Sequence, residues 1–128
     1  MKQDALLAKA DRACASARAL LDLGDADGAC NRGYYAMFDA ARAALVVADS
    51  KADSGKTHRG LINAFSERLV LTGLVKKETG RLLKRAEEIR LIADYRGDSI
   101  ELDDARLLVE QASEFVAAMR ALCAQKGV

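Results

Sequence analysis

The stretch NRGYYAMFDAARAAL, residues 31–45, decides the fold, because its apolar side chains recur at intervals of three and four residues. That spacing places them on one face of an α-helix. The apolar stripe starts at Cys30 and predicts a helix over about residues 25–48. On a helical wheel, Tyr34 and Phe38 lie with the stripe. We therefore expect both rings in the core of the protein.

A polar face adjoins this stripe on the same helix and carries Arg32, Tyr35, Asp39 and Arg42. Arg32 and Asp39 flank Tyr35 at spacings of three and four residues, so the two charges can pair around the phenol. Two interpretations stay open for this face. It is either a solvated or intersubunit salt-bridge surface, or a site that binds a ligand or a partner.

Similar apolar stripes fill most of the remaining chain, and glycine or polar segments separate them. They predict further helices before Gly24, from the N-cap Thr57 to about Gly73, between Val75 and Gly97, and after Asp98 or Ser99. Short links between long helices favour antiparallel neighbours. The sequence thus predicts an all-α fold, an up-and-down bundle of four main helices plus a shorter one.

The composition agrees with this prediction. The chain has 128 residues, lacks proline and is 51% hydrophobic, with alanine and leucine dominating, as is typical of packed helices. Its length predicts a single domain over residues 1–128. The alanine-rich flank at residues 36–44 allows another helix to approach closely, either within the chain or across a dimer.

Charge and cysteine content narrow the function classes. The formal net charge is only +1, so any contact with nucleic acid must come from a local patch. The chain has three cysteines, Cys14, Cys30 and Cys123, each within an apolar stripe of a predicted helix. Their spacing matches neither a disulfide framework nor a zinc site, so we expect buried thiols in a reducing compartment. We expect neither a metal nor a cofactor. No secretory signal or membrane-length apolar stretch is visible, so the expected location is the cytoplasm.

His58 is the only histidine, and it lies at the predicted start of a helix. The helix dipole there disfavours imidazolium, so a neutral, hydrogen-bonding role is favoured over a catalytic base. Further along, residues 76–85 are rich in lysine and arginine. Neighbouring glutamates make a solvated face a better interpretation than a phosphate-binding patch. Arg90 and Asp94 are four residues apart, so their side chains can pair on one helix face. The end of this helix can present Arg90 and Tyr95 to a cleft.

Four segments together resemble a known family: RGYYAMFDAARAAL, KTHRGLINAFSERLV followed by TGLV, RLLKRAEEIRLIADYRGD and EQASEFVAAMRAL. In this order, over about residues 15–122, they resemble the HEPN domains (higher eukaryotes and prokaryotes nucleotide-binding), in particular the small stand-alone prokaryotic kind. The resemblance implies an α-helical bundle that is commonly a homodimer. It also implies a minimal nucleotidyltransferase as partner in a toxin–antitoxin type pair.

Many HEPN domains are metal-independent RNases, and the resemblance implies a motif for this activity. The motif is an arginine followed, after four to six intervening residues, by a histidine that acts in acid–base chemistry. No arginine precedes His58 at that spacing, and the nearest equivalent is Arg90 followed by Tyr95. The resemblance makes these two the candidate catalytic residues. Tyrosine, with a pKa near 10, is a poor base at neutral pH, and Asp39 stands where relatives often have another histidine.

Three hypotheses follow from the residues and the resemblance. The first is a HEPN domain with weak or absent RNase activity that binds a nucleotide, RNA or the nucleotidyltransferase through the polar face and through Arg90 and Tyr95. In a variant of it, the partner modifies Tyr95. The second is an active RNase toxin in which Tyr95 or His58 replaces the missing histidine. The third is a purely structural helical partner protein.

Overall fold

The computed structural model describes residues 2–48, 57–95 and 99–126. Its elements are α1 (Lys2–Asp22), α2 (Ala26–Ala48), α3 (His58–Phe65), the π-helix η1 (Ser66–Val70), α4 (Lys77–Tyr95) and α5 (Leu102–Lys126). Within the described ranges every regular element is a helix and no strand is present. The predicted all-α bundle is confirmed.

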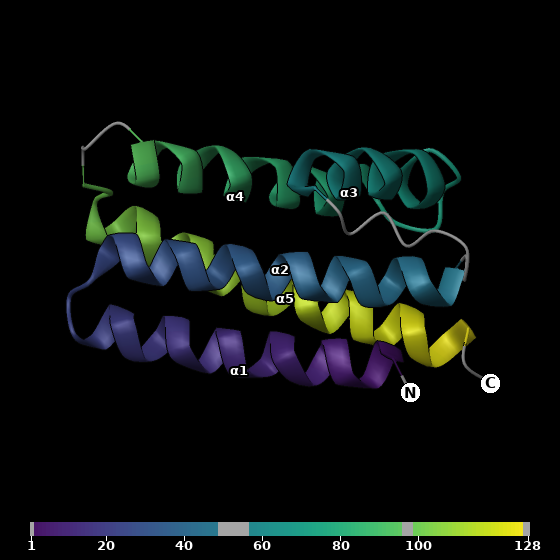
Figure 1. Ribbon diagram of the computed structural model, residues 1–128, viewed down its shortest axis with the longest axis horizontal. Helices are drawn as coiled ribbons and strands as arrows, with labels where there is room; N and C mark the ends of the chain where they lie inside the picture. The colour runs from purple at the N-terminus through teal and green to yellow at the C-terminus, as the bar shows by residue number, and fades with distance from the viewer. Residues whose placement is uncertain (1, 49–56, 96–98, 127–128) are drawn as a thin grey trace.

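Helix α2 lies at the centre of the bundle and contacts every other element. Figure 1 shows α1 along one side of α2 and both α3 and α4 along the other, while α5 runs behind α2 and contacts it. The alanines at positions 36, 40, 43 and 44 are all fully buried. Contacts within one chain therefore bury the alanine-rich flank, which lets the neighbouring helices approach closely.

The stripes expected to form the core do so. Tyr34 is fully buried and Phe38 is 7% exposed, as the helical wheel predicts. The stripe of α5 is buried along its length, with Phe115 packing against Phe65 of α3 at 5.7 Å between ring centroids. Cys14, Cys30 and Cys123 are buried free thiols, as expected. Burial raises the pKa of all three, and that of Cys30 to about 12.

Local signals set the helix ends. Thr57 caps α3, because its Oγ1 accepts a hydrogen bond from the Gly60 amide at 2.9 Å. Gly24 follows α1 with a φ of +83° and turns the chain toward α2. The helix ends expected at Gly97 and Asp98 lie outside the described residues.

The third helix differs from its prediction in one respect. The periodicity predicts an α-helix from Thr57 to about Gly73, whereas α3 ends at Phe65 and continues as the π-helix η1 to Val70. Helix α4 packs tightly on this segment: a Cβ added to Gly80 would lie 2.8 Å from Cγ2 of Val70. The glycine therefore permits the close contact between α4 and η1.

Candidate functional site

Aromatic rings gather where α2 meets the start of α3. Tyr34 and Phe38 lie one turn apart on α2, and the Thr57 cap places His58 as the first residue of α3. The Tyr34 hydroxyl lies 2.7 Å from Nδ1 of His58. The Phe38 and His58 ring centroids are 4.6 Å apart. The imidazole is thus held by one hydrogen bond and by ring packing.

Helix α4 adds two charged side chains to the same place. Glu87 and Arg90 are three residues apart and so face α2 together. The Tyr34 hydroxyl donates to Oε2 of Glu87 at 3.4 Å. The Arg90 guanidinium carbon lies 4.9 Å from the Tyr34 ring centroid, a cation–π distance. We call Tyr34, His58, Glu87 and Arg90 the Tyr34 cluster.

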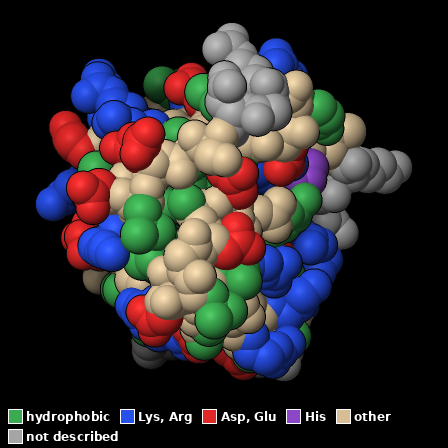
Figure 2. Space-filling model, turned by 90° about the vertical axis from the view of Figure 1, so that its left-hand side faces the viewer, with side chains coloured by type: hydrophobic (Ala, Val, Ile, Leu, Met, Phe, Trp, Pro, Cys, Tyr) green, Lys and Arg blue, Asp and Glu red, His purple; other side chains and the backbone are tan. Residues whose placement is uncertain are grey.

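The cluster is buried at its centre and accessible at its edge. Tyr34 is fully buried, whereas His58 is half-buried, and Figure 2 shows the single histidine of the chain at the surface beside acidic and basic side chains. Asp94 accepts a hydrogen bond from Arg90 Nη1 at 3.0 Å. The buried Arg90 Nε has no hydrogen-bond partner among the described residues. The Arg90 side chain is 12% exposed, so an added acceptor can approach its remaining N–H groups at the edge of the cluster.

Electrostatics keep the imidazole neutral. Burial lowers the pKa of His58 below 6.5, the Arg90 charge lowers it further, and the Glu87 charge opposes the shift. Burial also raises the pKa of the Tyr34 hydroxyl far above its usual value, with the Glu87 charge adding to the effect. At neutral pH the cluster thus holds a neutral imidazole, a neutral phenol and the Arg90 cation.

In the tautomer in which Tyr34 donates its proton to Glu87, Nε2 is the available imidazole nitrogen. An ionised Glu87 only accepts hydrogen bonds, so its contact with Tyr34 uses the phenol proton. The Tyr34 oxygen then accepts from Nδ1–H of His58, which leaves the lone pair on Nε2. A chain of carboxylate, phenol and imidazole orients His58 in this way. In this arrangement, Nε2 of the imidazole can take up a proton from a bound group.

The residues on the polar face of α2 lie in two different environments. Arg32 lies 5.8 Å from the Tyr35 ring centroid, and that ring lies 5.6 Å from His58, so both residues border the Tyr34 cluster. Asp39, in contrast, is 8% exposed and buried beside α1. Burial raises its pKa, and the charges of Lys9, Arg42 and Arg32 oppose this. A solvated position for Asp39 is therefore wrong, and the charge of Lys9 in α1 acts on its carboxyl.

Arg90 and Tyr95 have different positions. The predicted Arg90–Asp94 ion pair is present at 3.0 Å, and Arg90 lies inward over Tyr34. Tyr95, at the end of α4, is 78% exposed and makes no described contact with the cluster. The fold therefore brings Arg90 close to His58. The spacing of the family motif had suggested Tyr95 as the partner of Arg90.

Sequence reasoning missed two members of the cluster, Tyr34 and Glu87. Tyr34 was expected only in the core, yet a buried tyrosine needs a hydrogen-bond partner for its hydroxyl. That requirement was a usable signal. In the sequence, Glu87 was only one of the glutamates that offset the lysines and arginines of α4. Its spacing of three residues from Arg90 nevertheless places the two side chains on one helix face.

Within the described residues, no group of three or more His, Cys, Asp or Glu side chains is placed to hold a metal ion. No described helix combines the length and the apolar character that crossing a membrane requires.

An all-α bundle with an arginine and an imidazole at one buried tyrosine agrees in fold with the HEPN resemblance. A sequence model of the HEPN domain matches residues 3–122. The chain is 34% identical over 117 residues to a UPF0332 protein of Gloeobacter violaceus, covering 90% of each chain. It is 34% identical over 96 residues to a UPF0332 protein of Thermotoga maritima, covering 73% of this chain and 70% of the relative. The chain belongs to the HEPN family.

A third relative bears a functional name. It is a Methanocaldococcus jannaschii protein named "Putative toxin", 32% identical over 85 residues, which cover 66% of this chain and 61% of that protein.

Proposed function

We propose that this protein is the toxin component of a toxin–antitoxin type pair with a minimal nucleotidyltransferase, and that it binds RNA at the Tyr34 cluster and cleaves it weakly. The observation that carries the proposal is the meeting of Arg90 and His58 at the Tyr34 ring. Similarity to a relative named as a toxin supports the biological role. A homodimer, as the family resemblance implies, is part of the proposal.

The chemistry needs only groups that the cluster holds. The Arg90 guanidinium binds a phosphate oxygen of the RNA backbone. Nε2 of His58 takes the proton of the adjacent 2′-hydroxyl, whose oxygen then attacks the phosphorus. The bond from phosphorus to the 5′-oxygen of the next nucleotide breaks, that oxygen takes up a proton from water, and the His58 imidazolium returns its proton to the solvent. The products are a 2′,3′-cyclic phosphate and a free 5′-hydroxyl.

Weak cleavage has a physical reason in the same geometry. The Arg90 charge that binds phosphate also lowers the pKa of His58. A lower pKa makes the imidazole a weaker base, so proton transfer from the 2′-hydroxyl is slower. The cation that supports phosphate binding thus also weakens the base, and we expect RNA binding to be the stronger of the two activities.

The direct test incubates purified protein with labelled single-stranded RNA in the presence of EDTA. We expect slow cleavage that leaves 2′,3′-cyclic phosphate ends, and binding that weakens as salt rises. RNA with a 2′-deoxy group at the cleaved position should bind but stay intact. In cells, expression should arrest growth and co-expression of the cognate nucleotidyltransferase should relieve the arrest. Absence of both RNA binding and growth arrest overturns the proposal.

Tyr95 is the proposed target of the partner. Its ring is 78% exposed at the end of α4, so an enzyme can reach the hydroxyl, whereas the Tyr34 hydroxyl is buried in the cluster. Incubation with the cognate nucleotidyltransferase and ATP should raise the intact mass of the wild type and leave Tyr95→Phe unchanged. An equal mass gain in both proteins rejects Tyr95 as the target.

A further inference from the structure

A hollow lies between α4 and the segment formed by α3 and η1. It is a pocket of about 140 Å³. Its apolar lining comes from Ile62, Phe65, Val70 and Leu83, and its polar lining includes Lys77 and Lys84. Phe65 and Leu83 are 1% and 0% exposed, so the pocket floor is part of the packed core.

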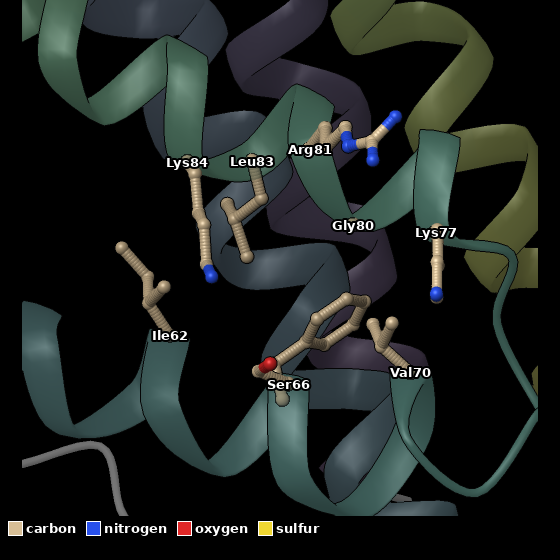
Figure 3. A pocket seen from close by; sticks show the side chains of 9 residues that line it. Ile62, Ser66, Val70, Lys77, Gly80, Arg81, Leu83 and Lys84 are labelled. Carbon is tan, nitrogen blue, oxygen red and sulfur yellow. The ribbon is translucent and has the colours of Figure 1, made fainter.

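Cations flank the opening of this pocket. In Figure 3 the side chains of Lys77 and Lys84 lie on two sides of the hollow with their ammonium groups toward it, while the Arg81 guanidinium turns away. An apolar floor accepts a flat, weakly polar ring, and flanking ammonium groups bind an anion attached to that ring. A nucleotide has both parts: the base suits the floor and its phosphate suits the lysines.

The pocket wall has an unusual construction. One side is the π-helix η1, which contributes Ser66 and Val70, and short π-helices occur frequently at functional sites. The other side is α4, where Gly80 has no Cβ that would meet Val70. A larger residue at position 80 would push Val70 from its present place, so the glycine preserves the shape of the pocket.

The pocket connects with the Tyr34 cluster along the groove between α3 and α4. A hollow of about 260 Å³ lies between them and is lined by Arg59, Asn63, Glu88 and three shared residues. Ile62 and Lys84 also line the pocket, and Glu87 belongs to the cluster. From Glu87 to Gly80, α4 rises by about 10 Å. A short extended single strand spans that distance.

We propose that this pocket is a base-binding subsite for single-stranded RNA, resting on the RNA-binding function proposed above. It holds the base of a nucleotide close to the phosphate bound at the Tyr34 cluster, and Lys77 and Lys84 bind the phosphate of that nucleotide. The subsite positions the strand along α4 so that the reacting phosphate reaches Arg90 and His58.

The test compares two double variants that remove the same charge from the same part of the chain. Lys77→Gln/Lys84→Gln changes residues that line the pocket, and Lys76→Gln/Arg85→Gln changes exposed neighbours that do not. Binding of a fluorescently labelled single-stranded hexanucleotide should weaken about tenfold or more in the first variant and less than about threefold in the second. Thermal unfolding checks that both variants are folded.

Abasic RNA provides a measurement that does not depend on a variant. Removal of one base at the position that the pocket binds should weaken binding to the wild type by about tenfold. The Lys77→Gln/Lys84→Gln variant should also bind this RNA more weakly than intact RNA, because the apolar floor that receives the base is unchanged. If the hexanucleotide binds the wild type but both double variants lose affinity equally, the subsite is wrong and RNA binding stands. If the wild type binds no RNA, the proposed function fails as well.

Discussion

His58→Gln is expected to slow RNA cleavage by about 10²–10⁴-fold, while the RNA affinity stays within about threefold of the wild-type value. Glutamine retains a hydrogen-bonding side chain near Tyr34 but has no group that takes up a proton near neutral pH. Arg90, which binds the phosphate in our proposal, is unchanged. A loss of rate without a loss of affinity is the signature of a missing acid–base group.

The measurement is single-turnover cleavage of labelled RNA, with the affinity determined separately on uncleavable 2′-deoxy RNA. Tyr95→Phe is the matched control, because Tyr95 is the other residue that the sequence offered in place of the missing histidine. It lies outside the Tyr34 cluster, so its removal should leave the rate unchanged. The reverse pattern, with a slow Tyr95→Phe and a normal His58→Gln, would move the acid–base role to Tyr95.

The pH dependence follows from the direction of the His58 shift. The imidazole is a base only when neutral, and burial with the Arg90 charge lowers its pKa below 6.5. The cleavage rate should therefore rise with pH at acidic values, with its midpoint below pH 6.5, and then reach a plateau. Tyr34, with its pKa raised by burial, stays protonated throughout this range. A rate that still rises between pH 7 and 9 contradicts a role for neutral His58.

The bundle was predictable from the sequence because each helix carries its own periodic stripe. The stripe of residues 30–45 placed Tyr34 and Phe38 in the core, and the alternation in α5 did the same for Phe115. Cap residues act over a few positions, so Thr57 correctly predicted the start of α3 and Gly24 the end of α1. Such signals are local, and the sequence contains them in full.

The site was less predictable because it depends on contacts between distant segments. Periodicity tells which face of a helix is buried but not which helix covers it. It therefore left Asp39 on a polar face that was either a salt-bridge surface or a binding site, whereas its side chain is buried. It also gave no reason to place His58 beside Tyr34, 24 positions earlier in the chain. The sequence did not predict the π-helix η1 for a similar reason, since the contact of this segment with Gly80 involves another helix.

Arg90→Gln is expected to lower both the RNA affinity and the cleavage rate, the latter by about 10²–10³-fold. The variant removes the cation that binds phosphate in our proposal. It also removes a charge that lowers the pKa of His58, so that pKa should rise. The imidazole thus becomes a stronger base while cleavage falls. This opposition separates phosphate binding from a general disturbance of His58.

Both effects can be measured on one protein. His58 is the only histidine in the chain, so its imidazole proton resonance in NMR titrates without overlap from another histidine. Arg85→Gln is the control, because Arg85 is exposed on the same helix and lies outside the cluster. It should change neither the His58 pKa nor the rate appreciably. A fall in the His58 pKa in Arg90→Gln, or an unchanged RNA affinity, would show that Arg90 does not act on the imidazole and the phosphate as proposed.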